Sequence, residues 1–179
     1  MSDLELSGNR TQATVSMVSI FDTETRTWLE VPRAAKNIPE GRDHAGAAVV
    51  GDKMYVLGGR INGQENTRDT VFILDLCDMK AGWKTSKSKM PTRRGGVSAS
   101  AIGNKVYVLG GEGNTVVESG VFDQVEAYDS VKDEWEMVAT MKVPRHGTYA
   151  VAVRGGVYVP GGGVMQGGGP VADFDVFEA

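Results

Sequence analysis

The chain has 179 residues, of which 41% are hydrophobic, with a formal net charge of −4 and a pI near 5.2. This length allows one substantial core, while the acidic balance excludes nucleic acid and anionic membranes as general partners, because both need a basic surface. No apolar run approaches the roughly eighteen residues of a membrane helix, and the first ten residues lack the basic and apolar regions of a signal peptide. The compartment therefore stays open: cytoplasmic or, for a piece of a longer protein, secreted.

Residues 1–15 form a polar lead that carries no mark of the later repeats. The lead holds Asn9-Arg10-Thr11, which matches the acceptor pattern for N-glycosylation, a pattern that also arises by chance. After it, Val15–Asp22 and Thr27–Val31 are two apolar segments around a polar turn, which is typical of a hairpin. We interpret residues 16–38 as half of a repeated sheet unit, with Trp28 packed against a neighbouring sheet.

The complete unit has four predicted strands. They are a small-residue inner strand, a Tyr strand ending in a Gly pair, an apolar strand ending in Asp, and a strand opening with Trp. In residues 39–90 these marks are Ala45–Val50, Tyr55, Gly58-Gly59, Leu74-Asp75 and Trp83. The unbroken run of small residues favours a strand buried on both sides. Between the first two strands, Gly51-Asp52 suits a two-residue turn with positive φ at its first position.

The pattern returns in residues 91–141 and, less completely, in residues 142–179. Its marks there are Tyr107 and Tyr158, Gly110-Gly111 and Gly161-Gly162, and Trp135. The Tyr positions are separated by fifty-two and fifty-one residues, and an Arg stands thirteen residues before each of the three: Arg42, Arg94 and Arg145. A period near fifty residues, with one Gly pair and one Trp per period, is typical of a propeller rather than a solenoid of helices.

These marks resemble the kelch-repeat family and, more loosely, its galactose-oxidase-like members. The resemblance covers residues 16–177 and implies an all-β, kelch-type β-propeller with about three four-stranded blades. We expect one propeller segment over residues 1–179: a half blade at 16–38, blades at 39–90 and 91–141, and a partial blade at 142–179. The resemblance also implies a protein or sugar ligand on the face where the long loops meet.

Three blades do not close a ring, because propellers usually have about four to eight and open sheet edges promote aggregation. Kelch rings mostly have six blades, as the resemblance implies. We therefore expect either a missing N-terminal half or a homodimer in which two copies form one ring. The missing half is preferred, since natural monomers avoid such exposed edges.

Alternate connections of an antiparallel meander lie at the same end of the sheet. The segments before each inner strand and the long loops 60–70, 112–124 and 163–171 therefore share one face. Long loops on a rigid scaffold often carry binding. The candidate ligand-binding residues on this face are Arg42, His44, Asn66, Arg94, Glu112, Asn114, Arg145 and His146.

Arginine offers a planar fork of donors that suits carboxylates. The three in-phase arginines thus predict a cationic ring that binds a protein segment or a carbohydrate. The alternative is that each arginine braces its own loop, since residues of a repeat are often structural. If the arginines bind ligand, replacing Arg94 and Arg145 together should abolish binding without lowering the melting temperature.

A carbohydrate-acting enzyme is the alternative function, either a sugar isomerase or epimerase or, less favoured, a copper oxidase. The resemblance implies that such a copper site would use two Tyr, two His and a Cys. Here only Tyr149 lies outside the repeat positions, and Cys77 falls away from the channel. Because a metal site needs three or four ligands, His44 and His146 are insufficient, and we predict no metal or other cofactor. The Gly-rich stretch 161–169 lacks the Lys-Ser/Thr end of a phosphate loop and is predicted to be a flexible loop.

Overall fold

The structure, a computed structural model, describes residues 13–178, so the glycosylation pattern at Asn9 lies outside the described residues. Regular structure within this range is β-sheet, apart from one 3-10 turn, η1 (Met79–Ala81). No helix in residues 13–178 is long and apolar enough to cross a membrane. The all-β class that we predicted is therefore confirmed.

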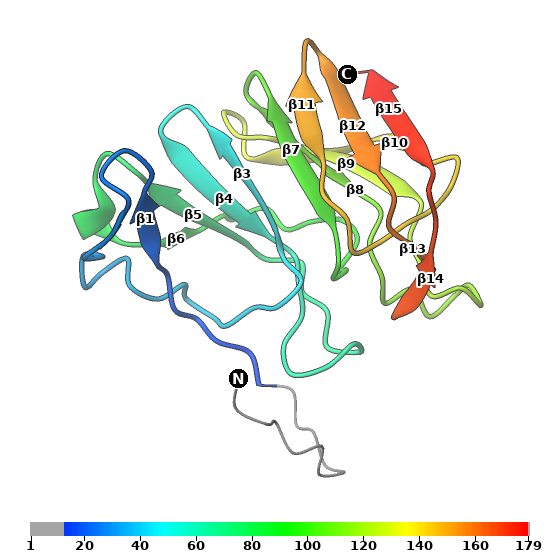
Figure 1. The fold of residues 1–179 in the computed structure, drawn as a ribbon, viewed down its shortest axis with the longest axis horizontal. Helices are drawn as coiled ribbons and strands as arrows, with labels where there is room; N and C mark the ends of the chain where they lie inside the picture. Colours follow the sequence, from blue (N-terminus) through cyan, green and yellow to red (C-terminus); the bar gives the residue numbers. More distant parts are fainter. Residues whose placement is uncertain (1–12, 179) are drawn as a thin grey trace.

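The strands form a fan of antiparallel sheets (Figure 1). The half blade is β1 (Ile20–Asp22) and β2 (Thr27–Leu29). The second blade is β3 (Gly46–Val50), β4 (Lys53–Leu57), β5 (Val71–Asp75) and β6 (Lys84–Thr85). The third blade is β7 (Ser98–Ile102), β8 (Lys105–Leu109), β9 (Gln124–Asp129) and β10 (Glu134–Thr140). The last blade is β11 (Val151–Val153), β12 (Gly156–Pro160) and β15 (Phe174–Glu178), and β13 (Gly163–Met165) pairs with β14 (Gly168–Pro170) in a separate hairpin.

Strand order within each blade follows the order in the chain, as in a propeller. The inner strand β7 packs between the inner strands β3 and β11, so the blades share one axis. The turns that join first to second strands lie at one end of the blades, and hairpin β13–β14 lies at the opposite end (Figure 1). The turn glycines Gly51 and Gly103 have φ of 54° and 59°, which confirms the expected positive φ.

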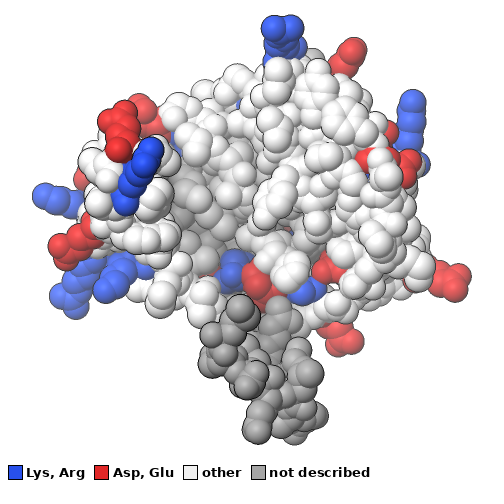
Figure 2. Space-filling view, viewed as in Figure 1, with Lys and Arg blue, Asp and Glu red and all other residues white. Residues whose placement is uncertain are grey.

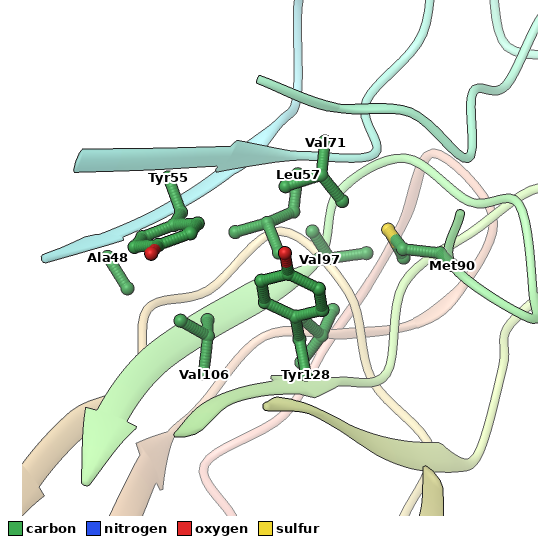
Figure 3. Close-up of a cluster of buried hydrophobic side chains, with 9 residues drawn as sticks. Ala48, Tyr55, Leu57, Val71, Met90, Val97, Val106 and Tyr128 are labelled. Carbon is green, nitrogen blue, oxygen red and sulfur yellow. The ribbon is translucent and has the colours of Figure 1, made fainter. Parts of the chain in front are cut away.

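Aromatic side chains fill the core between neighbouring blades. The rings of Tyr55 and Tyr128 lie 5.7 Å apart, from β4 and β9 of adjacent blades, in a cluster that also contains Val97 and Val106 (Figure 3). Trp135 packs against the same cluster, as expected for a Trp of the fourth strand. Interfaces of this kind supply most of the buried apolar area that holds thin sheets together.

Two expectations about packing and loops were wrong. Trp28 is 70% exposed, and its ring contacts Phe21 of the same half blade rather than a neighbouring sheet. Trp135 of the third blade packs against a cluster that contains residues of the preceding blade, so the residues that would cover Trp28 belong to a blade before the half blade, which is not among the described residues. The Gly-rich stretch 161–169, expected to be a flexible loop, instead contributes to hairpin β13–β14, whose tip residues Gln166 and Gly167 bond to the loop 112–124.

Tyr128 is expected to titrate late. Its hydroxyl donates to Asp133 Oδ1 at 2.8 Å, and burial raises the pKa of the phenol to about 12. An unfolded tyrosine ionises near pH 10, so this group stabilises the fold below pH 10 and the contribution is lost as the pH rises towards about 12. Ultraviolet absorbance of tyrosinate should show a late-titrating phase in the wild-type chain, and the amplitude of this phase should fall in Tyr128→Phe. Burial also raises the pKa of Tyr55, so part of the late phase remains in the variant. An unchanged titration curve in that variant would contradict this assignment.

The face of the last blade that points away from the third blade, which we call its outer face, is exposed. The corresponding face is buried in the second and third blades. Pairing with the second strands makes Val71, Val125 and Phe174 equivalent third-strand positions. Val71 and Val125 are 0% and 2% exposed, whereas Phe174 is 63% exposed. The next blade that would cover Phe174 is not among the described residues. Side chains of both charge signs are mixed over the molecule in this view, around its rim and also near its lower centre (Figure 2).

Candidate functional site

The long loops meet on one face, which we call the loop face: residues 42–47, 60–70, 93–99, 112–124, 145–149 and 163–171. Short antiparallel bridges join the segment before each inner strand to the residue after each Gly pair. They connect Asp43 with Arg60, Gly95 with Glu112, and His146 with Gly163. The Gly pairs fit these close approaches, since a Cβ on Gly111 would lie 2.8 Å from the carbonyl oxygen of Gly95. The repeat thus brings chemically different residues to equivalent places on this face.

The three in-phase arginines lie inside their blades. Arg94 and Arg145 are 0% and 1% exposed. Arg94 donates to the carbonyls of Gly110 at 2.7 Å and Gln124 at 2.8 Å, and to Glu126 Oε2 at 2.9 Å. Burial lowers the pKa of the Arg94 guanidinium, and the charge of Glu126 opposes that change. These contacts match the bracing role that we considered as the alternative, rather than a ring that faces a ligand.

The third strand supplies a different partner for the arginine in each blade. The Arg42 guanidinium lies over the ring of Phe72, 5.0 Å from its centroid, and Arg42 Nε donates to the Gly58 carbonyl at 3.0 Å. Arg145 reaches Val159 O at 3.1 Å and lies 2.9 Å from Asp175 Oδ2. One bracing geometry is therefore stabilised by a cation–π contact in one blade and by carboxylates in the others.

The two predicted asparagines hold their own loops in shape. The Asn66 side-chain amide donates to the Ile61 carbonyl at 3.0 Å. Asn114 accepts a bond from the Val116 backbone N–H at 3.0 Å and donates to the Val121 carbonyl at 3.3 Å. Their polar atoms are thus used in positioning loops 60–70 and 112–124.

A chain of polar contacts, the inter-blade network of Asp43, His44, Arg60, Glu112 and His146, crosses the loop face. Arg60 Nη1 donates to Glu112 Oε1 at 2.6 Å, and Arg60 Nε donates to Asp43 Oδ1 at 2.7 Å. Arg60 Nη2 lies 3.1 Å from His44 Nε2. Because arginine only donates, His44 Nε2 accepts here, and its Nδ1–H donates to Asp43 Oδ1 at 2.7 Å.

The network continues into the last blade through His146. Its Nε2 lies 2.7 Å from the Met165 carbonyl, to which it donates, and its Nδ1 lies 3.4 Å from Glu112 Oε2. The tip of hairpin β13–β14 covers Glu112, because the Gly167 N–H donates to Glu112 Oε2 at 2.9 Å. Buried charge pairs with several hydrogen bonds are expensive to rearrange, so the network holds three blades in a fixed relation.

Arg60 and Asp43 were not among the eight candidate residues predicted from the sequence. The repeat pattern could have identified Arg60. It directly follows the pair Gly58-Gly59, just as the predicted residue Glu112 directly follows Gly110-Gly111. Two charges of opposite sign at equivalent places in adjacent blades are positioned to pair across the interface. Of the eight predicted residues, the network brings together His44, Glu112 and His146, whereas Arg42, Arg94 and Arg145 remain separated inside their blades.

Beside the network lies a groove of about 400 Å³, which we call the channel groove: His44–Ala47, Gly96–Ala99 and Gly147–Tyr149. Its floor is built from backbone and small side chains of the inner strands. Gly96 N–H donates to the His44 carbonyl at 2.8 Å, and Gly147 N–H donates to the Gly96 carbonyl at 2.9 Å. Tyr149, at 85% exposure, and the exposed His44 flank this groove.

Residues 13–178 contain no group of three or more His, Cys, Asp or Glu side chains placed to hold a metal ion. Cys77 is exposed just after β5, on the outer part of its blade, and the charge of Asp52 is the main reason that its thiol pKa is raised. His44 and His146 are engaged by the inter-blade network.

An open arc of blades around a common axis, with Gly-Gly loops and buried arginines in phase, defines a kelch-type β-propeller segment. The chain belongs to the kelch-repeat family described as the KLHDC2/KLHL20/DRC7 Kelch-repeats domain, which matches residues 6–178. Domains of this family typically act as protein-interaction modules.

Similar proteins include kelch-like proteins and an enzyme. The Kelch-like protein terF of Aspergillus terreus (strain NIH 2624 / FGSC A1156) is 37% identical over 156 residues, which are 87% of this chain and 33% of that protein. Human Kelch-like protein 25 is 38% identical over 112 residues, 63% of this chain and 17% of that protein. The N-acetylneuraminate epimerase of Vibrio cholerae serotype O1 is 33% identical over 107 residues, 58% of this chain and 26% of that protein. The chain thus spans a third or less of the length of these relatives.

Proposed function

We propose that this chain binds an extended segment of a partner protein in the channel groove of the loop face. The observation that carries the proposal is Tyr149, a large aromatic side chain that is 85% exposed beside a groove of small residues. Tyrosine is enriched where proteins bind one another, because it buries a large area and loses little conformational entropy. The protein-interaction role typical of the family supports the same function.

The proposed roles of the eight predicted residues differ. His44 contacts the ligand, since it is exposed and lines the groove. The other seven (Arg42, Asn66, Arg94, Glu112, Asn114, Arg145 and His146) position the loops through the contacts described above. A groove held by paired buried groups is preorganised, which reduces the entropic cost of binding.

Binding is tested with peptides selected on the purified chain from a random displayed library. We expect Tyr149→Ala to weaken the selected peptides by about tenfold or more without loss of stability, because the side chain is exposed. Val131→Ala is the matched control: Val131 is also exposed, in the turn between β9 and β10 at the opposite end of the blade. Equal affinities of both variants would refute the groove as the site.

A carbohydrate is the alternative ligand, and a sugar isomerase or epimerase is the alternative function. The similarity to an N-acetylneuraminate epimerase favours a test of this alternative. Glu112 and His146 also form an acid–base pair, with Glu112 Oε2 and His146 Nδ1 3.4 Å apart. Proton NMR of N-acetylneuraminate would then show faster anomer exchange with the chain, and slower exchange again with Glu112→Gln. No acceleration by the wild-type chain would exclude this activity for the chain alone.

The open outer face of the last blade supports a further proposal about assembly. Either additional blades of the same protein or a second copy of this chain covers this face. Additional blades are preferred, because natural monomers avoid exposed sheet edges. Light scattering on the purified chain separates the two: a clean dimer supports a ring of two copies, and a monomer or an aggregate supports the need for more blades.

A further inference from the structure

His44 has a backbone conformation that is unusual for its residue type. Its φ is 56°, in the left-handed region, where a side chain is strained. The equivalent positions of the next two blades, each two residues after an in-phase arginine, are Gly96 and Gly147, with φ of 61° and 65°. Strain of this kind persists only where the surroundings hold the residue in place, and it is common at functional sites. The contacts of the imidazole therefore need an explanation.

The imidazole of His44 lies between a carboxylate and a guanidinium. Its Nδ1 is 2.7 Å from Asp43 Oδ1, and its Nε2 is 3.1 Å from Arg60 Nη2. Both hydrogen bonds form only when Nδ1 carries the hydrogen and Nε2 keeps its lone pair, because the carboxylate accepts and the guanidinium donates. These two contacts thus require a neutral imidazole in a single tautomer.

Protonation of His44 would break one of these bonds and keep the other. An imidazolium donates from both nitrogens, so Nε2 could no longer accept from Arg60, and two positive groups would face each other. The bond from Nδ1 to Asp43 would remain and would become charge-assisted. Because 42% of the His44 side chain is exposed, the ring can turn into solvent. Acidification therefore separates His44 from Arg60.

Arg60 keeps its other partners when the ring turns away. It donates to Asp43 Oδ1 at 2.7 Å and to Glu112 Oε1 at 2.6 Å. In residues 13–178, Asp43 and Arg60 are the charged groups in contact with His44, Glu112 reaches it through Arg60, and Tyr149 lines the same groove. The Arg60–Glu112 pair between the blades therefore survives the change.

The other histidine of the network responds in the opposite sense. Neutral His146 donates from Nε2 to the Met165 carbonyl at 2.7 Å, and its Nδ1 lies 3.4 Å from Glu112 Oε2. Protonation of Nδ1 adds a donor towards this carboxylate and breaks no bond. Acid should therefore tighten the contacts of His146 while it loosens those of His44.

The backbone at His44 joins neighbouring segments. Asp43 and Arg60 exchange N–H to carbonyl bonds at 3.0 and 2.9 Å, and the His44 carbonyl accepts the Gly96 N–H of the next blade at 2.8 Å. Since the strained backbone of His44 is held by its side-chain contacts, loss of the Arg60 contact should loosen these three backbone bonds.

We propose that His44 is a pH-sensitive switch on the loop face. The neutral ring bonds to Arg60 and fixes the junction of the second and third blades, and the protonated ring turns away from Arg60 and loosens this junction. The turned ring also adds a positive charge to the channel groove, whose other lining residues are uncharged near neutral pH. The switch belongs to the chain without ligand, so it does not depend on the proposed peptide binding.

The tautomers of the two histidines in the chain provide the first test. Nitrogen NMR of the rings at about pH 8 should show hydrogen on Nδ1 of His44 and on Nε2 of His146. His146→Gln assigns the signals, because only those of His44 then remain. Hydrogen on Nε2 of His44 would overturn the proposal, since that nitrogen could not accept from Arg60.

Amide hydrogen exchange provides the second test. The amides of Asp43, Arg60 and Gly96, corrected for the intrinsic effect of pH, should exchange about tenfold faster at about pH 5 than at about pH 8. His44→Gln does not titrate in this range and should abolish the difference, whereas His146→Gln should keep it.

His44→Gly guards against a folding defect in the glutamine variant. Glycine is the residue at both equivalent positions and fits the φ of 56° without strain, so this variant should fold. It should also lose the pH-dependent difference. A difference of wild-type size in both His44 variants, or no difference in the wild-type chain down to about pH 5, would overturn the proposal.

Discussion

Replacing Arg94 with methionine is expected to lower the free energy of unfolding by about 3–5 kcal/mol. Arg94 is fully buried, and its removal leaves the Glu126 carboxylate, 2.9 Å away, without its counter-charge. It also leaves the carbonyls of Gly110 and Gln124 without a donor. Urea unfolding monitored by circular dichroism measures the change, which is large against the roughly 5–15 kcal/mol of a typical domain.

The neighbouring residue provides the control. Arg93 is exposed and lies 3.5 Å from Asp69, so Arg93→Met should cost less than about 1 kcal/mol. Adding Glu126→Met to Arg94→Met should recover part of the loss, because no charge then remains buried alone. Equal stabilities of the Arg93 and Arg94 variants would contradict the bracing role. A ligand-binding ring would instead lose affinity at unchanged stability, as the sequence pattern first suggested.

Gly110→Ala is expected to destabilise the chain by roughly 2–5 kcal/mol, the sum of a left-handed backbone and a steric overlap. Gly110 has φ of 59°, and a Cβ there would overlap the Arg145 carbonyl oxygen of the next blade. That carbonyl already accepts the Gly111 N–H at 2.8 Å, so the blades cannot separate without breaking this bond. Thermal and urea unfolding measure the change.

Gly103→Ala is a closely matched comparison. Gly103 has the same φ of 59°, but a Cβ on it would meet no atom within 4 Å. Only the conformational cost remains, about 1–2 kcal/mol. The difference between the two variants therefore isolates the close approach of neighbouring blades at the Gly pair. Identical losses would show that this approach contributes nothing to stability.

The blades were predictable because their signals are local and repeat in phase. The turn at Gly51, the small strand before it and the spacing from Tyr55 to Tyr107 each indicate the same four-stranded unit. When several weak local signals recur at one period, they support each other, and the agreement specifies the architecture.

The candidate site was harder to predict because sequence position does not reveal which way a side chain points. Arg94 precedes an inner strand on the loop face, yet its guanidinium turns inward to Glu126, thirty-two residues further along the chain. The pairing of Arg60 with Glu112 depends on the contact between two blades, which no single repeat encodes. Tyr149 stood out in the sequence only as the Tyr outside the repeat pattern, and its exposure beside the channel groove required the structure.

The most direct measurement of the proposed function is a hydrogen–deuterium exchange footprint of a library-selected peptide on the wild-type chain. If the peptide binds in the channel groove, the backbone amides of residues 44–47, 96–99 and 147–149 should exchange more slowly when the peptide is present. Exchange in the turns at Gly51-Asp52 and Gly103-Asn104 should not change. Protection confined to those opposite-end turns, with no change along the channel groove, would contradict it.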